Sequence, residues 1–212
     1  MVRQSIQQSI YRTTVVSSLM MATVSILYPL QARAEIQSTQ FEMYPVGQFV
    51  PCLAKPGLQP KVRVTVVRGE LNDHLNIQLE GFKEGVKFDL FSIENTPQLP
   101  DGSRDPNFKN FGLAWYQSDL EAGSTSLRTI FLDQIFGIDT SGTRGPVKTF
   151  HLGFWFNNPK DAQACGFDVT KPTPFNGEHQ AGPLAFVTRQ IAGRAAKLGP
   201  LCTKPNGQKC DP

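Results

Sequence analysis

FHLGFWFNNPKD, residues 150–161, is the stretch that decides the fold. Apolar residues alternate with others across residues 149–157, a period of two that is typical of a β-strand. Aromatic side chains around a central glycine suit a pleated, half-buried surface better than a helix. We therefore predict a strand with one core-facing row, made of Phe150, Leu152, Phe154 and Phe156.

The residues that follow predict a short helix and then a second strand. Asn158 can cap the free amides of a helix, and Pro159 suits the first helical position. Gly166, directly after Cys165, is expected to end this helix. The apolar residues 184–187 and Thr188 predict the second strand.

Further short strands are predicted from alternating apolar residues at 61–68, 75–79, 87–94, 112–120 and 126–132. The first two of these form a hairpin. Within residues 87–94 two apolar pairs are out of phase, which indicates a bulge or burial on both faces. Proline and glycine predict surface loops at 97–110 and 137–145. About seven short strands with little helical periodicity describe an all-β fold, a single antiparallel, immunoglobulin-like β-sandwich.

The first 34 residues have the pattern of a cleaved export signal. Arg3 and Arg12 precede an apolar run at residues 15–30, and Ala32-Arg33-Ala34 fits a cleavage site after Ala34. The alternative is an uncleaved anchor, but serine, threonine and proline interrupt the run. We expect a secreted or periplasmic protein without a membrane span in its mature part. We divide that part into an extended segment (35–60), the sandwich (61–192) and a tail (193–212).

The charge of the chain argues against a nucleic-acid partner. The full chain has 21 Lys and Arg against 18 Asp and Glu. Three of the arginines and none of the acidic residues lie in residues 1–34, so the rest has 18 of each sign. A nearly neutral protein without a stripe of basic residues offers no footprint for phosphate binding.

Four cysteines in an exported chain predict two disulfides, with three possible pairings. Cys202 and Cys210 enclose a Pro-Asn-Gly turn, so we pair them and assign Cys52 to Cys165. The alternative is free thiols or a metal site. The chain has no CxxC motif and no cysteine with a histidine at ligand spacing, so we predict no metal and no cofactor.

Two places are candidate binding sites. His151 and Trp155 should lie on the strand face opposite the phenylalanines, where an exposed tryptophan can stack on a sugar or an apolar side chain. The alternative is that the short helix or the Cys165 loop covers Trp155. The second candidate is the loop 174–182, because loops often carry function. Its polar side chains can bind a ligand or only cap a turn; they are Asn176, Glu178 and His179.

Several segments together resemble a group of uncharacterised exported bacterial β-sandwich proteins. They are FDLF (88–91), FGLAWYQ (111–117), HLGFWFNNPKDA (151–162) and TPFNGEH (173–179), and the likeness covers residues 60–190. The resemblance implies export and a β-sandwich, and it implies no activity or catalytic residue.

The order of parts is also similar, more remotely, to copper/zinc superoxide dismutases. That family binds its metals with a cluster of histidines and an aspartate, whereas this chain has three histidines in all. Where the family has a His-x-His motif, this sequence has Trp155-Phe-Asn157. The similarity therefore implies a superoxide-dismutase-like sandwich shape without the activity.

No motif predicts a reaction. Ser118, Ser124 and Ser141 lie in no GxSxG elbow, and the acidic residues are scattered near strand ends. We expect a non-enzymatic module that binds a protein or a surface glycan. One alternative is a hydrolase or a degenerate metal enzyme that uses the 174–182 loop. Another is a structural component of the envelope or matrix.

Overall fold

The computed structural model describes residues 38–67, 73–123, 127–131, 134–139, 142–171, 173, 180–193, 198–202, 205–206 and 209–210. The strands within 127–148 and 205–210 are described by their backbone alone. The predicted export signal, residues 1–34, lies outside the described part. Residues 35–212 form one compact unit. None of the described helices is long and apolar enough to cross a membrane.

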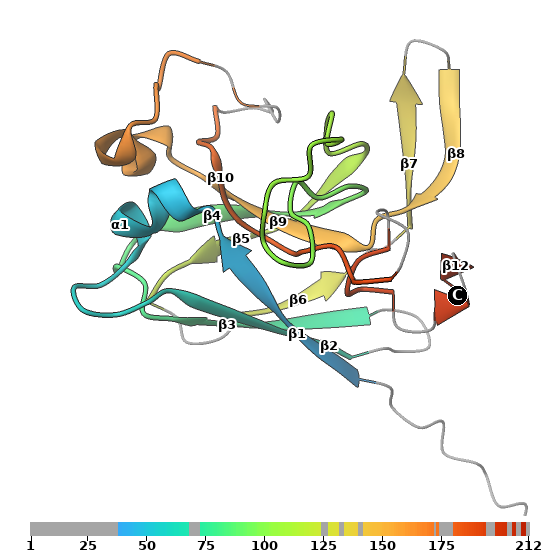
Figure 1. Cartoon of the computed structure of the whole chain (residues 1–212), viewed down its shortest axis with the longest axis horizontal. Coiled ribbons are helices and arrows are strands. Elements are labelled where there is room, and N and C mark those ends of the chain that lie inside the picture. Colours follow the sequence, from blue (N-terminus) through green and yellow to red (C-terminus); the bar gives the residue numbers. More distant parts are fainter. Residues whose placement is uncertain are drawn as a thin grey trace, which may run out of the picture. The chain divides into compact units, whose positions relative to one another are not determined.

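The regular secondary structure of the described chain is mostly β-strand (Figure 1). One α-helical turn and two 3-10 helices interrupt it: η1 (Gly47–Phe49), α1 (Val50–Leu53) and η2 (Pro159–Cys165). The strands are β1 (Ser38–Pro45), β2 (Lys61–Val67), β3 (Asp73–Glu80), β4 (Lys87–Ile93), β5 (Ala114–Glu121), β6 (Leu127–Phe131), β7 (Gln134–Asp139), β8 (Gly142–Lys148), β9 (His151–Phe156), β10 (Leu184–Val187), β11 (Pro205–Asn206) and β12 (Lys209–Cys210).

Eight of these strands form one antiparallel sheet in the order β5-β4-β9-β10-β1-β2-β3-β6. Strand β1 joins its two halves, because Ser38 to Met43 pair with β2 whereas Tyr44 and Pro45 pair with β10. The predicted all-β, antiparallel fold is confirmed. The two separate sheets of a sandwich are not confirmed, since β1 makes the sheet continuous.

The sheet curls around its core. β5 and β6 follow one another in the chain, separated by residues 122–126, yet they occupy opposite ends of the strand order. A flat sheet would hold its first and last strands about 34 Å apart at a spacing of about 4.8 Å per strand. The short connection therefore requires a strongly curved sheet, and the backbones of β5 and β6 do approach one another.

The core lies inside this curl. In β2 every second residue is buried, and the facing residues of β3 are buried in the same way. Across the core they face the predicted row on β9, in which Leu152, Phe154 and Phe156 have no exposed surface and Phe150 has 7%. The predicted inward row is therefore confirmed. Burying one such side chain stabilises the fold by about 2 kcal/mol.

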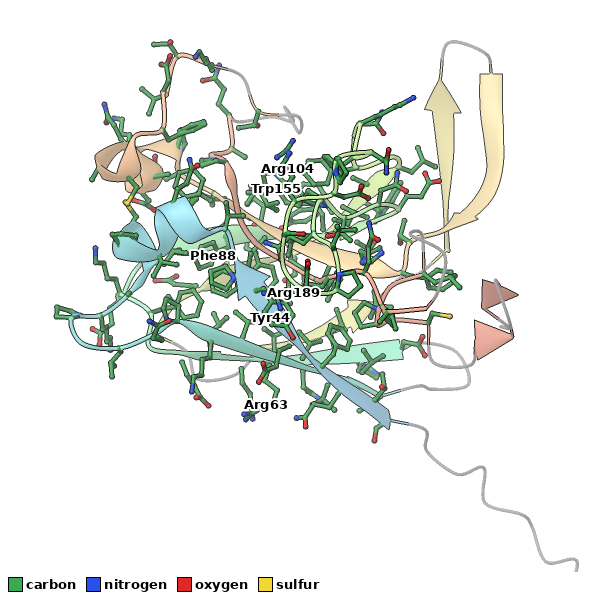
Figure 2. The ribbon with its side chains drawn as sticks, viewed as in Figure 1. Tyr44, Arg63, Phe88, Arg104, Trp155 and Arg189 are labelled. Carbon is green, nitrogen blue, oxygen red and sulfur yellow. A yellow bond between two sulfur atoms is a disulfide. The ribbon has the colours of Figure 1, made fainter. Side chains whose placement is uncertain are left out.

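The helix after β9 begins and ends as predicted, although it is a 3-10 helix. The Asn158 side chain accepts a hydrogen bond of 3.0 Å from the Lys160 amide, and Gly166 ends the helix at a φ of 87°. This placement brings Cys165 to Cys52 of α1, with 6.0 Å between their Cα atoms. The predicted Cys52–Cys165 disulfide is confirmed (Figure 2).

The predicted second disulfide joins Cys202, whose side chain is described, to Cys210, whose side chain is not. Cys202 is disulfide-bonded. The Cys210 side chain lies outside the described part, so its pairing with Cys202 stays a prediction. The backbone pairs β11 with β12 around the predicted Pro-Asn-Gly turn. The tail is also part of the core, because Leu198 and Leu201 are buried in the main cluster.

Two expectations about loops and linkers are wrong. Residues 35–60, expected to form an extended segment outside the sandwich, contain β1, which is a central strand of the sheet. The expected loop at 137–145 falls within the hairpin of β7 and β8. Among the described strands β7 and β8 pair only with each other, and such edges are compatible with glycine and proline because an unpaired edge tolerates a missing amide.

Candidate functional site

The expected binding face of β9 is covered, so the prediction that His151 and Trp155 are exposed is wrong. Both side chains have no exposed surface. The Trp155 indole meets the rings of Phe91 and Phe111, with 5.4 and 5.0 Å between centroids. Gly153 makes room for it, because a Cβ there would lie 2.4 Å from the indole. Trp155 is the centre of a second, small core on the outer face of the sheet.

His151 has a structural position. Its Nδ1 lies 3.0 Å from the Thr188 hydroxyl, which also accepts a 3.1 Å hydrogen bond from the Leu152 amide. Gly199 packs against the ring so closely that a Cβ there would lie 2.6 Å from Nδ1. This histidine therefore ties β9 to the end of β10 and to the C-terminal segment.

The second predicted site falls largely outside the described residues. The residues outside the described part include Asn176, Glu178 and His179. Their expected role as a binding site therefore stays a prediction. The end of the 174–182 loop is described: Ala181 and Gly182 are buried, and the Gly182 amide donates a 2.5 Å hydrogen bond to the Phe156 carbonyl.

The cover over Trp155 is a long ordered loop, residues 94–113, between β4 and β5. We call it the covering loop. Hydrogen bonds between the amides of Glu94 and Asn95 and the carbonyls of Leu113 and Phe111 close its base, at 3.0 and 2.9 Å. Side-chain oxygens at three positions accept the amide two residues onward, as in Asx turns: Asp101, Asp105 and Asn110. Long loops with this much internal order are often functional.

The covering loop is also fastened to the chain that follows β10. The Thr96 hydroxyl donates to the Thr188 carbonyl at 2.5 Å, and this contact is buried. The backbone amide of Gln190 donates to the Gln98 carbonyl at 3.0 Å. The side-chain Nε2 of Gln190 donates to the Asp105 carboxylate at 2.7 Å. These bonds fix the conformation of the loop, and a preformed loop lowers the entropy cost of binding.

An arginine completes this attachment. The Arg189 guanidinium lies over the Tyr44 ring, with 3.6 Å from Cζ to the centroid (Figure 2). It also packs against Gly102 of the covering loop, where a Cβ would lie 2.4 Å from a guanidinium nitrogen. Gly102 has a φ of 90°, so both its conformation and its closeness to Arg189 favour glycine.

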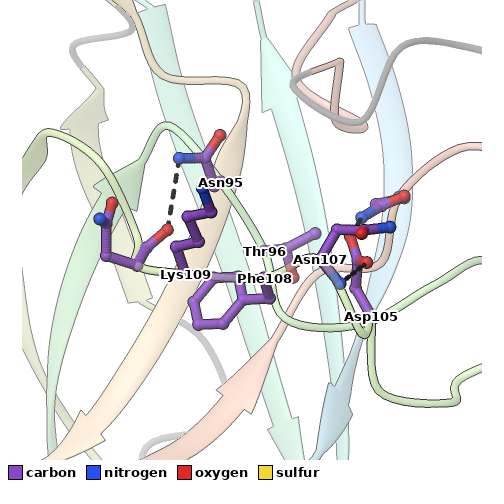
Figure 3. Close-up of a pocket in the computed structure, with 8 residues that line it drawn as sticks. Asn95, Thr96, Asp105, Asn107, Phe108 and Lys109 are labelled. Atoms are coloured by element: carbon purple, nitrogen blue, oxygen red, sulfur yellow. Dashed lines mark hydrogen bonds between the residues drawn. The ribbon is translucent and has the colours of Figure 1, made fainter.

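A polar hollow of about 310 Å³ opens between the covering loop and Gln190 (Figure 3). We call it the polar hollow. Asp105 is occupied within it, because it accepts hydrogen bonds from the Asn107 amide and from Gln190. The side chains of Asn107 and Lys109 are exposed, and within the described part of the chain neither has a hydrogen-bond partner. The hollow is lined by Asn95, Thr96, Asp105, Asn107, Phe108, Lys109, Asn110 and Gln190.

A second, larger pocket of about 480 Å³ shares Phe108 with the polar hollow. We call it the Arg104 pocket, after the single charged side chain in its lining. The other lining residues are mostly apolar and come from the covering loop, from η1 and the residue before it, from the segment after η2 and from the start of β10. They are Val46, Gly47, Gln48, Phe49, Pro97, Gln98, Gly102, Phe108, Phe111, Phe167, Pro183 and Leu184.

One carboxylate of the covering loop has a shifted pKa. Hydrogen bonds from the Ser103 hydroxyl and amide lower the pKa of Asp101, which therefore stays ionised. Within the described residues no group of three His, Cys, Asp or Glu side chains could hold a metal ion. The linings of the two sites together offer amides, the Thr96 hydroxyl, the Asp105 carboxylate, one ammonium, one guanidinium and aromatic rings.

Comparison with known proteins gives no family. The chain matches no protein-family model, no curated protein and no solved structure.

The covering loop was predicted as a surface loop, but its role was not. One local signal could have indicated its order: three Asx residues, at 101, 105 and 110, each stand two positions before Ser, Asn or Gly. Nothing local indicates that the loop folds back over β9, because Phe111 and Trp155 are far apart in the sequence.

Proposed function

We propose that this protein is an exported, non-enzymatic binding module that recognises a glycan in the polar hollow. The observation that carries the proposal is the side-chain chemistry of the hollow. Asn107 can both donate and accept hydrogen bonds, Lys109 donates, and Phe108 supplies an apolar ring beside them. Sugars present hydroxyl groups that donate and accept, next to apolar C–H surfaces, so these three side chains match them.

The rigidity of the covering loop supports the same proposal. Its backbone amides at 103, 107 and 112 are held by side chains of the loop itself. Binding a flexible sugar then requires ordering of the ligand and of two exposed side chains, but not of the loop.

The hollow favours binding over hydrolysis. Glycoside hydrolysis ordinarily uses two carboxyl groups on either side of the scissile bond. Among the described lining residues Asp105 is the one carboxylate, and hydrogen bonds from Asn107 and Gln190 occupy both of its oxygens. A hydrolase that uses Glu178 and His179 remains an alternative outside the described part of the chain.

Export is part of the proposal. Its support is the signal-like pattern of residues 1–34 together with the Cys52–Cys165 disulfide, because structural disulfides persist in oxidising compartments.

An oligosaccharide array, followed by affinity electrophoresis in soluble polysaccharides, tests glycan binding. The informative variant is N107A/K109A, which removes two side chains that make no hydrogen bond within the described structure. Losing two hydrogen bonds to a ligand should weaken binding about tenfold or more. The matched control is K61A/Q78A, which truncates exposed side chains on β2 and β3.

Three results decide the proposal. It is supported if a glycan binds the native protein, binds the control equally well and binds N107A/K109A at least about tenfold more weakly. It fails if the array and the gels detect no glycan, or if the N107A/K109A variant binds like the native protein. Melting temperatures of both variants show whether the fold is intact.

A protein partner is the second candidate, and a different surface favours it. Trp115 and Tyr116 of the edge strand β5 are 46% and 49% exposed, which is unusual for adjacent aromatic residues. Adjacent exposed aromatics are typical of protein interfaces. Trp115→Ala in a pull-down tests this candidate without touching the covering loop; unchanged capture of partners would remove it. A structural envelope component, the third alternative, would self-associate without any ligand.

A further inference from the structure

The Arg104 pocket combines apolar walls with one cationic side chain. Phe108, Phe111 and Leu184 contribute to its lining, and the last two also pack on Trp155 in the outer-face core. Its volume of about 480 Å³ is in the range of small-molecule sites. A ligand therefore meets an aromatic surface that the fold already holds in place.

The charge at this pocket is not balanced by a neighbouring acid. The Arg104 side chain is exposed and lies over the Phe108 ring, with 5.9 Å from Cζ to the centroid. In the described part of the chain no carboxylate forms an ion pair with Arg104. The two acidic residues next to it in the loop are engaged elsewhere, Asp101 with Ser103 and Asp105 with Gln190.

We propose that the Arg104 pocket binds a small carboxylate with an apolar, aromatic or short aliphatic body. The body lies against Phe108 and Phe111, and the carboxylate accepts hydrogen bonds from the Arg104 guanidinium. A planar guanidinium matches a carboxylate in a bidentate arrangement. The inference does not rest on the proposed glycan function, because Arg104 lies outside the lining of the polar hollow.

The choice of an anion over a neutral apolar ligand follows from Arg104. A neutral ligand would cover part of the pocket mouth and take water from the guanidinium without replacing its hydrogen bonds. A carboxylate replaces them. An ammonium ligand would be repelled by the same charge.

The experiment compares phenylacetate with phenylacetamide, a neutral molecule of nearly the same shape. Trp155 is the reporter, since it touches Phe111, and the W115F background leaves it as the single tryptophan. Titration of each probe into the purified protein gives two dissociation constants. We expect phenylacetate to bind about fivefold more tightly, the upper range for a solvent-exposed charge pair.

R104Q and R63Q identify the charge responsible. Arg63 is exposed on β2, and Figure 2 shows it on the far side of the fold from Arg104. In R104Q the two probes should bind equally, whereas R63Q should keep the preference of the native protein. Both positions are exposed, so both variants are expected to fold, and near-ultraviolet circular dichroism checks that they do.

The proposal is overturned by any of three results: neither probe binds at millimolar concentration, both bind the native protein equally, or R104Q keeps the preference. Failure here leaves the glycan proposal intact, because that test uses Asn107 and Lys109. Loss of glycan binding in N107A/K109A likewise leaves the phenylacetate preference unchanged.

Discussion

The ring of Phe111 meets the indole of Trp155 edge-on, with 5.0 Å between centroids and 80° between the planes. This contact joins the covering loop to β9. Because of this contact the outer face of the strand is a second core and not a solvent-exposed surface. Phe111 also lines the Arg104 pocket, so one wall of that pocket rests on Trp155, the fully buried one of the two tryptophans.

Phe111→Ala should detach this cover. Phe111 is half-buried, so we expect a loss of about 2 kcal/mol in the free energy of unfolding, below the cost of a fully buried phenylalanine. In a W115F background the emission of Trp155 should shift to longer wavelength as water reaches the indole. Leu58→Ala, at a residue that is 54% exposed, is the control and should change stability by less than about 0.5 kcal/mol. An unshifted emission in Phe111→Ala would contradict the covering role.

Gly153→Ala should push a methyl group into the indole. The added Cβ would lie 2.4 Å from Trp155, so one of the two must move, at a cost of about 2 kcal/mol. The cost should shrink when Trp155 is first replaced by leucine, because the clash is then removed. Gly47→Ala is the control, since no atom lies within 4 Å of a Cβ there. Equal costs of Gly153→Ala in both backgrounds would show that the strain has another source.

The Cys52–Cys165 disulfide should contribute strongly to stability because it spans 113 residues. On the chain-entropy model its loss lowers the free energy of unfolding by about 5 kcal/mol. C52A/C165A removes this bridge without reducing the one that contains Cys202. The midpoint of urea unfolding, compared with that of the native protein, measures the loss. A midpoint that does not fall would mean that the bridge constrains an unfolded state already held together by other means.

Tyr116 should ionise late. Desolvation, followed by its 2.8 Å hydrogen bond to Asp119, raises the pKa of Tyr116 from 10.0 to about 12. The folded protein therefore holds this proton more tightly than the unfolded chain does. The resulting stabilisation is complete below pH 10 and is lost as the pH rises from 10 to about 12.

An ultraviolet titration checks this value. The difference between the native protein and Tyr116→Phe isolates one phenol, and Asp119→Asn should move its midpoint back toward 10. A midpoint near 10 in the native protein would contradict the arrangement of Tyr116 and Asp119.

Local patterns predicted those parts of the fold that local chemistry determines. The period of two in β9, the Asn158 cap and the Gly166 stop each depend on neighbouring residues. The structure confirms them, because alternate side chains of β9 belong to the main core and Trp155 belongs to the outer one. The phase change in β4 was also informative. Strand β4 is buried on both faces and faces a bulge in β5, between the partners of Leu90 and Phe91.

The candidate site could not be predicted in this way, because it depends on contacts between distant segments. His151 and Trp155 were assigned to an open face, since nothing in β9 itself indicates a cover. That cover arrives from a loop some forty residues earlier, and it is held by Thr96, Gln98 and Asp105 through partners beyond β10. Strand β1 was missed for a related reason. Its central place in the sheet depends on pairing with β10, which is distant in the sequence, as well as with β2.

The position of β1 also sets the order in which the protein can assemble. It is the first described strand, yet Tyr44 and Pro45 pair with Val187 and Phe186, which are synthesised about 140 residues later. Until those residues are present, β1 can pair with β2 alone, so the join between the two halves of the sheet along β1 forms late in synthesis.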